Sequence, residues 1–421
     1  MSHKIISILC LLLLTAPLRG QQSKIYDADL RTLRMTVNGK SCDFPVITLG
    51  KGESFDLSFD DLRHDYRRFT YRLEHVAADF QTDEGLFDNE YMVADDSELP
   101  LEGYTQSMNT SILYNHYSLS IPNADMRPLI SGNYRLIING EDEDGEPMRA
   151  LEVYFGVTEQ LAPITLSATT DTEIDRNDAH QQLTLTVDCS NLGVRDAATD
   201  VKIVVRQNGR YDNAAVDPRP TGQMGQVLKW EHSRELIFKA GNEFRKFEQT
   251  STRYPGMHVD RVRYKDPYYF ALLMPDAPRR NYLYDEDQNG AFVPRSDRNG
   301  DPDTEADYMW MLFSLEMPPL PDHDVYVDGI WTAHDFTPAL KMDYEPEDGV
   351  YELPLLLKQG YYSYQYLAVP KNGGPAETRP IEGDFYQTEN RYDVFVYSRK
   401  PGERYDRLVG WRQGSFSIRH K

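Results

Sequence analysis

The loop Asp285–Gly290, with the sequence DEDQNG, contains residue types and a spacing that suit a hard cation. Carboxylate or amide oxygens at loop positions 1, 3 and 5, followed by Gly at position 6, can wrap Ca²⁺. In this sequence those oxygens come from Asp285, Asp287 and Asn289. The pattern then fails, because position 12 is Ser296, where a bidentate Glu normally completes the shell. We consider two interpretations, a calcium site at these three residues and a solvated acidic turn, and we favour the turn.

Residues that could carry out catalysis are scattered rather than grouped. Hydrolysis needs a nucleophile with a base, or paired carboxylates, in one pocket. The histidines occur singly, and the sequence has no HExxH, GxSxG, Walker loop or GxGxxG motif. Asp60 and Asp61 are adjacent, but neighbouring strand residues point to opposite faces, which favours a structural role at a strand end. We therefore predict no catalytic residue, no small-molecule substrate and no cofactor other than the calcium considered above.

The segment Gly360–Tyr366, with the sequence GYYSYQY, is the strongest candidate for binding. On a strand Tyr362, Tyr364 and Tyr366 share one face, where they can stack on sugar rings or on a partner protein. The alternative, which we favour, is that this face forms the core of a sandwich and that only Tyr361 lies outside.

Two further segments could contact a partner. With Trp331 in VDGIW, the tyrosine segment resembles small carbohydrate-binding modules and early-set immunoglobulin-like modules. In Gly241–Phe247, Arg245 lies near Glu243 and Glu248, which predicts an ion-paired corner, with an interface as the alternative. Aromatic and Arg residues are frequent interface anchors but also frequent core residues. On this basis the candidate interface residues are Phe244, Arg245, Trp331, Tyr361, Tyr362 and Tyr364.

Composition restricts the class of protein. The chain has 421 residues and a formal charge of −22, and this acidity argues against nucleic acid as a partner. It contains 28 Tyr, a residue that suits half-buried strands, so an all-β chain is favoured.

The first twenty residues predict export. An apolar run at 5–18, between Lys4 and Arg19, is too short to span a bilayer and is typical of a signal peptide that is cleaved after Gly20. Its removal takes away two basic residues and brings the charge to −24. No later segment is long and apolar enough to span lipid, so we predict a soluble or peripheral mature protein.

Short alternating runs, separated by Gly, Asp, Asn and Pro, predict antiparallel strands throughout the chain. We therefore expect an all-β, multi-domain protein of tandem β-sandwich or immunoglobulin-like domains. The expected divisions are a signal peptide at 1–20, an N-terminal sandwich at 21–160, a middle β-rich domain at 161–318, an early-set-like C-terminal domain at 319–410 and a tail at 411–421, which is either disordered or an added strand.

Cys42 and Cys189 remain after cleavage and lie 147 positions apart. In an oxidising compartment they can form one disulfide. Thiols so distant in sequence are more often separate buried residues, so we favour two unpaired cysteines and do not expect folding to depend on a disulfide.

As a set, ten stretches of the sequence resemble one family, the type IX secretion system Plug proteins of Bacteroidota. They are FDDL (59–62), YRLEHVAADF (71–80), SMNTSILYNHY (107–117), ISGNYRL (130–136), QNGRYDNA (207–214), GNEFRKF (241–247), DQNGAF (287–292), ADYMWMLFSLE (306–316), LLLKQGYYSYQY (355–366) and TENRYDVFVYSRKPGERYDRLVG (388–410). One departure is visible at His75–Phe80, where the family pattern HC-x-ADW becomes HVAADF. This change keeps an apolar site but puts a specific contact at that corner in doubt.

The resemblance implies a protein that is not an enzyme. Such proteins are exported to the periplasm, bind the giant outer-membrane β-barrel translocon and close its periplasmic opening when no substrate is passing. The competing hypothesis is a periplasmic or surface glycan-binding sandwich protein that uses Trp331 and the tyrosine face. The position of Tyr362, Tyr364 and Tyr366 discriminates between the two, because a glycan platform must lie outside the core.

Overall fold

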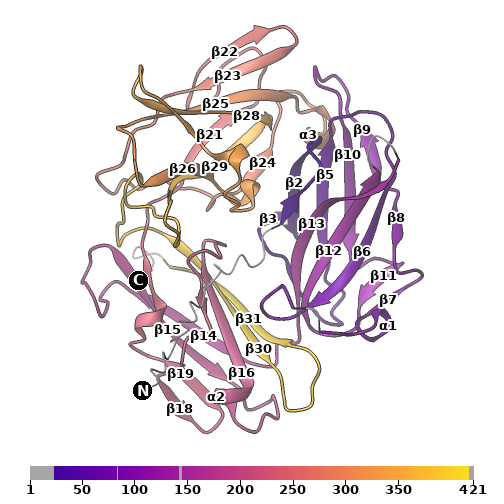
Figure 1. Cartoon of the computed structure of the whole chain (residues 1–421), viewed down its shortest axis with the longest axis vertical. Helices are drawn as coiled ribbons and strands as arrows, with labels where there is room; N and C mark the ends of the chain where they lie inside the picture. The colour runs from indigo at the N-terminus through magenta and orange to yellow at the C-terminus, as the bar shows by residue number, and fades with distance from the viewer. Residues whose placement is uncertain (1–22, 83, 142–144, 417–421) are drawn as a thin grey trace, which may run out of the picture.

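The computed structural model describes residues 23–82, 84–141 and 145–416. The chain is nearly all β, with 48% strand and 5% helix, and its mainly antiparallel sheets form three β-sandwich lobes. In Figure 1 the first lobe lies at the right, the middle lobe at the lower left and the third lobe at the upper left. This confirms the predicted all-β, multi-domain sandwich class, whereas the immunoglobulin-like and early-set-like details stay predictions. The predicted signal peptide lies outside the described residues.

The first lobe consists of β1 to β13. One sheet has the order β1-β13-β12-β6-β8 with β4 beside β13, the other has the order β3-β2-β5-β10-β9, and β11 pairs with β7. The elements are β1 (Lys24–Ile25), β2 (Leu30–Val37), β3 (Lys40–Cys42), β4 (Val46–Thr48), β5 (Phe55–Asp61), β6 (Phe69–Val76), α1 (Asp88–Tyr91), β7 (Met92–Ala94), β8 (Leu99–Leu101), β9 (Tyr104–Gln106), β10 (Asn115–Ile121), β11 (Met126–Pro128), β12 (Gly132–Glu141) and β13 (Pro147–Thr158).

The alternation of apolar and polar residues in the sequence explains how these two sheets pack. In β6 the buried residues from Phe69 to His75 are at every second position, so one side of the strand faces the core. Phe55 of β5 and Phe155 of β13 meet across the sandwich with ring centroids 4.8 Å apart. Because both sheets contribute large apolar side chains, the lobe has a core of its own.

The middle lobe combines two distant parts of the chain. One sheet has the order β14-β15-β19-β18 with β20 beside β15, and the other has the order β17-β16-β30-β31. The elements are β14 (Ile164–Thr169), β15 (His180–Asp188), α2 (Ala197–Asp200), β16 (Val201–Gln207), β17 (Ala215–Val216), β18 (Gly222–Met224), β19 (Val227–Trp230), η1 (Arg234–Leu236), β20 (Ile237–Lys239), β30 (Asn390–Ser398) and β31 (Arg407–Phe416).

The third lobe is inserted between these two parts. One sheet has the order β21-β29-β24 with β26 beside β29, and the other has the order β22-β23-β25-β28-β27. The elements are β21 (Arg245–Gln249), β22 (Val259–Lys265), β23 (Tyr268–Leu273), β24 (Phe292–Pro294), α3 (Pro302–Glu305), β25 (Tyr308–Glu316), β26 (His323–Asp328), η2 (Ile330–Thr332), η3 (Pro338–Leu340), β27 (Asp343–Glu345), β28 (Val350–Lys358) and β29 (Gly360–Pro370).

The expected divisions 161–318 and 319–410 do not follow the sheets. Strands β21 to β25 share the third lobe's core with β26 to β29, whereas β30 and β31 return to the middle lobe. The chain enters the third lobe near Gly241 and returns from it near Thr388, and these two segments lie side by side. Thr388 Oγ1 donates to Gly241 O at 2.9 Å, and Asn390 Nδ2 donates to Ala240 O at 2.8 Å. The expected division was wrong because β16 pairs with β30, a strand far along the sequence. Turn residues in the sequence indicate pairing only between strands that follow one another.

Strand β30 is buried along its whole length. Val394 points into the middle lobe's core, while Phe395 points into a second apolar cluster shared with Phe44 and Phe80 of the first lobe. A strand covered on both faces reads as a continuous apolar run, which explains the sequence YDVFVYS. Residues 411–416 extend β31, so that part of the expected tail is a strand.

The two cysteines lie in different lobes and are both free, as favoured. Cys42 belongs to β3 of the first lobe, and Cys189 is buried in the core of the middle lobe. Among the described residues, none of the helices is long and apolar enough to cross a bilayer.

Candidate functional site

The carboxylate oxygens of the loop Asp285–Gly290 bind other groups of the protein. Asp285 Oδ1 lies 2.5 Å from Lys246 Nζ, and Asp287 accepts hydrogen bonds from the backbone N–H groups of Asn289, at 2.7 Å, and Phe244. Burial raises the pKa of Asp287 to about 7. In the described part of the chain no three His, Cys, Asp or Glu side chains are grouped to hold a metal. Calcium binding at Asp285, Asp287 and Asn289 stays a prediction.

Arg245 is ion-paired, but not with the residues we expected. Its guanidinium bonds Glu382 at 2.9 Å and Asp276 at 2.7 Å, both distant in sequence. Glu243 instead accepts a hydrogen bond from the Tyr282 hydroxyl, and Glu248 pairs with Arg295. The proximity of charges along the sequence was therefore a poor guide to partners. Glu248 is three positions from Arg245 on β21 and points to the opposite face, and Glu243 precedes the strand.

The aromatic interface candidates lie inside the third lobe. The buried side chains are Phe244, Tyr361, Tyr362, Tyr364 and Tyr366. The Tyr364 hydroxyl donates to Asp276 Oδ2 at 2.7 Å, and the half-buried Trp331 donates from Nε1 to Ser363 O at 3.0 Å. The tyrosine face is thus the core, as favoured, and Tyr361 is buried as well. The tyrosine face is therefore not exposed to bind a glycan, as the glycan-binding hypothesis requires.

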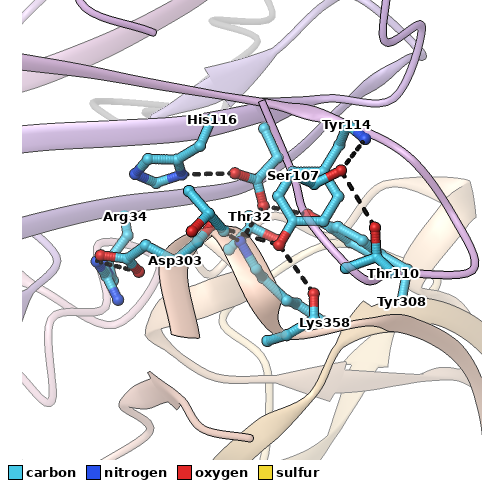
Figure 2. A network of polar contacts seen from close by, with 12 residues as sticks. Thr32, Arg34, Ser107, Thr110, Tyr114, His116, Asp303, Tyr308 and Lys358 are labelled. Atoms are coloured by element: carbon cyan, nitrogen blue, oxygen red, sulfur yellow. Dashed lines mark hydrogen bonds and ion pairs between the residues drawn. The ribbon is translucent and has the colours of Figure 1, made fainter. Parts of the chain in front are cut away.

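The structure brings together a different set of residues where the first lobe meets the third. At its centre the fully buried Asp60 of β5 binds Lys358 Nζ of β28 at 2.7 Å and the Tyr308 hydroxyl of β25 at 2.6 Å. His116 Nδ1 of β10 lies 2.7 Å from the other carboxylate oxygen. Figure 2 shows His116, Tyr308 and Lys358 converging from the two lobes. We call Asp60, His116, Tyr308 and Lys358 the sealed junction.

The position of Asp60 follows from strand geometry. It is adjacent to Asp61, and the two side chains leave β5 on opposite faces. Asp60 reaches the third lobe, whereas Asp61 stays within its own lobe and pairs with Arg67 at 3.3 Å. The pair is therefore two separate structural ion pairs.

Three groups of the sealed junction have pKa values that differ from their usual ones. Burial by itself raises the pKa of Asp60, but the Lys358 ammonium and His116 more than offset this, so the pKa lies below its usual range. Burial also lowers the pKa of Lys358, although the Asp60 carboxylate opposes that change. Burial and the nearby carboxylate together raise the pKa of Tyr308 well above its usual value.

Further contacts surround the sealed junction. The Tyr114 hydroxyl donates to Ala306 O at 2.8 Å, and Lys358 Nζ lies 4.3 Å from the Tyr114 ring centroid. Arg34 of β2 pairs with Asp303 of α3 at 2.9 Å, as Figure 2 shows. Because every contact joins the first lobe to the third, these residues hold the two lobes as one body.

An acid, a base and a phenol in one cluster could suggest general acid–base chemistry. Such chemistry requires access for a substrate, and the Asp60 and Lys358 side chains are 0% exposed. Asp60 already holds three partners, so no group is left to exchange a proton with a ligand. The arrangement supports a structural role.

A second charged junction joins the first lobe to the middle lobe. Asp43, which follows β3, lies 3.1 Å from Arg206 Nη1 and 2.5 Å from Arg391 Nη2. Arg206 also lies over the rings of Phe44 and Phe395, with its central carbon 5.3 Å and 4.8 Å from their centroids. Cations stacked on rings and paired with a carboxylate bind strongly when desolvated, so this contact is also rigid.

A cavity of about 570 Å³ lies where the three lobes meet. Many of its lining residues are apolar, among them Leu33, Trp331 and Leu355, and its polar lining includes Arg31. The one thiol on its wall, Cys42, has a pKa raised to about 12 by burial, so it is not a thiolate nucleophile. Cys42 therefore gives the cavity no thiolate nucleophile, and the polar lining also includes Asp43, Arg206 and His334.

Sequence reasoning missed both junctions, although one signal was visible. Lys358 ends the apolar run LPLLL, and Arg206 ends the run VKIVV. A charge at the end of a buried strand must find a partner or remain in water. That signal identifies a candidate buried charge, but it does not identify Asp60 or Asp43 as the partner.

Comparison with known proteins gives a match to a family model over the first lobe and a match to a solved structure over nearly the whole chain. A family model described as "Type 9 secretion system plug protein 1st domain" matches residues 30–157, which correspond to the first lobe. The crystal structure of a hypothetical protein from Parabacteroides merdae ATCC 43184 is 37% identical, covers 94% of this chain and 100% of its own, and has a TM-score of 0.90. The major pilin subunit BcpA of Bacillus cereus matches at 8% identity over 56% of this chain and 61% of its own, and its TM-score of 0.15 carries no weight. No curated protein matches.

Proposed function

Because the chain belongs to the type IX secretion system plug family, which is secretion-related and not enzymatic, we propose that it is the gating component of that system. In this proposal the protein resides in the periplasm, binds the giant outer-membrane β-barrel translocon and closes its periplasmic opening when no substrate is being exported. The match of the first lobe to the plug model is the observation that carries the proposal.

The construction of the molecule supports this function physically. A body that closes a wide aqueous pore must resist being deformed or split between its parts. Here three sandwiches are fused by buried ion pairs, such as Asp60 with Lys358 and Asp43 with Arg206. Breaking such a pair leaves a buried charge without a partner, which costs several kcal/mol. The lobes are therefore expected to move as one unit.

The first test is affinity purification of the tagged protein from its native envelope. Recovery of the large outer-membrane barrel is expected, and its absence, together with strong retention on a polysaccharide array, would reverse the assignment.

A second test addresses closure directly. Deletion of the protein, in cells whose substrate export is blocked, is expected to make the outer membrane leaky to large solutes. Unchanged permeability in that strain would mean that the protein binds the barrel without closing it.

A further inference from the structure

One segment has a net positive charge, whereas the chain as a whole is acidic. Residues 253–280 contain six Lys or Arg and three Asp, a net charge of +3, in a chain whose formal charge is −22. The same segment contains Tyr254, Tyr264 and Tyr268, which are 71%, 57% and 39% exposed. Tyr and Arg are the residue types enriched among interface anchors. This combination of charge and exposed aromatic surface is centred on the β22–β23 hairpin, which lies at the top of the molecule in Figure 1.

Strand register places the basic and apolar residues on one face. Across the hairpin Arg261 is opposite Leu272, Arg263 is opposite Phe270 and Lys265 is opposite Tyr268. Residues directly opposite in a sheet project to the same side. We call these six residues the hairpin face.

The hairpin face continues onto the next strand. Phe270 is in register with Trp310 of β25, and Leu272 is in register with Leu312. The rings of Tyr268 and Trp310 meet edge to face with centroids 6.4 Å apart, which confirms that they share a side. The alternate residues Ala271 and Leu273 are buried in the third lobe's core, so the hairpin face points outward.

The cations of the hairpin face are available for a partner. Arg261 pairs with its neighbour Asp260, and both side chains are about half exposed, at 52% and 50%. Arg263 and Lys265 are exposed, and in the described ranges neither has a carboxylate within ion-pair distance. Beside them Phe270 and Leu272 are only half-buried. Strand β22 is also the edge of its sheet, so its backbone is open to pairing.

Resting on the proposed function, we propose that the hairpin face docks an acidic, extended segment on the periplasmic side of the translocon. Alternate strand residues lie about 7 Å apart, so Arg261, Arg263 and Lys265 form a row about 14 Å long. A strand with Asp or Glu at alternate positions matches this row and pairs with the open edge of β22. The adjacent apolar strip then supplies desolvated contact area, while the exposed charges steer the approach.

The charge pattern of the whole sheet favours a protein over a lipid surface. On the same side as Leu312 and Pro354, the far strands place Glu352 opposite Ser314 and Asp343 opposite Glu352. The face is therefore basic at one edge and acidic at the other. A flat anionic membrane would repel the acidic edge, whereas a protein partner can match both.

The decisive variant is Arg261→Glu/Arg263→Glu/Lys265→Glu in the full chain. Its matched control is Lys51→Glu/Arg68→Glu/Arg127→Glu, which makes the same change of charge at exposed positions of the first lobe. Each tagged protein is purified from solubilised native envelope, and the recovered barrel is quantified. We expect the hairpin variant to recover at least about ten-fold less barrel and the control to lose less than about two-fold. Recovery with the wild type is also expected to fall as salt rises.

Two additions keep the result interpretable. The melting temperature of the hairpin variant should stay within about 2 °C of the wild type, because its substitutions are at exposed positions. The conservative variant Arg261→Lys/Arg263→Lys keeps the charge and should retain most of the barrel.

Each alternative occupant gives a distinct result. Equal recovery by the hairpin variant and the control overturns the docking site but leaves the plug function standing, whereas failure of the wild type to recover the barrel overturns both. Flotation of the wild type, but not the hairpin variant, with phosphatidylethanolamine vesicles containing about one quarter phosphatidylglycerol would identify a lipid surface instead. A wild-type dimer that the variant converts to a monomer in light scattering would identify a second copy.

Discussion

The sealed junction and the hairpin face both contain a lysine and a tyrosine, but the environments of these residues differ. Tyr308 is 0% exposed, whereas Tyr268 is 39% exposed. Lys358 is fully buried and lies 2.7 Å from Asp60, whereas Lys265 is exposed on an edge strand. A buried lysine requires a carboxylate, because an unpaired charge is not tolerated away from water. An exposed lysine is hydrated by water and needs no carboxylate until a partner binds.

This difference distinguishes a site that holds the lobes together from a site that can bind another molecule. In the sealed junction the side chains are already fixed, so they stabilise the arrangement of the lobes and offer nothing to another molecule. On the hairpin face the same groups keep their hydration and their freedom until a partner arrives. Tyr and Lys content alone therefore identifies neither kind of site, and the number of partners already bound decides between them.

The largest expected effect comes from breaking the sealed junction. Lys358→Met leaves the Asp60 carboxylate buried without its ammonium, and we expect the free energy of unfolding to fall by about 3–5 kcal/mol. Urea or guanidinium unfolding followed by fluorescence measures this loss.

Two controls test the cause. Lys341→Met removes an ammonium that pairs with Asp324 at 2.9 Å on the surface, and it should cost less than about 1 kcal/mol. The double variant Asp60→Asn/Lys358→Met removes both charges and should be more stable than Lys358→Met alone. A double variant that is less stable would show that the loss comes from packing rather than from an unpaired charge.

Removing one hydroxyl from the sealed junction should have a smaller effect. Tyr308→Phe deletes the O–H that donates to Asp60 Oδ2 at 2.6 Å, while Lys358 and His116 still hold the carboxylate. We expect a loss of about 1–2 kcal/mol in the same unfolding measurement. The matched change Tyr268→Phe, on the hairpin face, should stay within about 0.5 kcal/mol of the wild type. Equal losses in the two variants would mean that the two regions do not differ as described.

Local parts of this fold could be predicted from the sequence, and long-range parts could not. Alternation identified strands such as β6, and it placed Tyr362, Tyr364 and Tyr366 on one face with a core as the favoured environment. The pairing of β16 with β30 depends on a chain reversal around an entire inserted lobe, for which no local signal exists. This is why the expected domain divisions failed.

The same limit applies to the two sites. The partner of Lys358 is 298 positions away, so its burial could not be inferred from its neighbours. On the hairpin face, the alternating Arg261, Arg263 and Lys265 were visible in the sequence. Their exposure was not, because it depends on the sheet order that places β22 at an edge.

A third prediction concerns a buried carboxyl outside both regions. Burial raises the pKa of Asp287 to about 7, above the value of about 4 expected in the unfolded chain. The folded state therefore binds more protons between about pH 4 and pH 7, and stability falls as the pH rises through that window. Asp287→Asn removes the titrating group, so its stability relative to the wild type should rise from pH 4 to pH 8, by at most about 4 kcal/mol for a pKa raised from about 4 to about 7. Unfolding curves across this range measure the change, and parallel curves for the two proteins would contradict it.

The smallest effect on stability, and the sharpest test of the comparison, is expected from Tyr268→Ser. Because this side chain is 39% exposed and lies outside the core, the free energy of unfolding should change by less than about 0.5 kcal/mol. If the hairpin face docks a partner, however, loss of the ring should lower barrel recovery about three-fold or more, since aromatic anchors dominate interfaces. The control Tyr66→Ser removes a ring that is 63% exposed on the first lobe, and it should leave recovery unchanged. Equal loss of recovery in both variants would assign the effect to exposed tyrosine in general, and not to the position of Tyr268 beside the cations of the hairpin face.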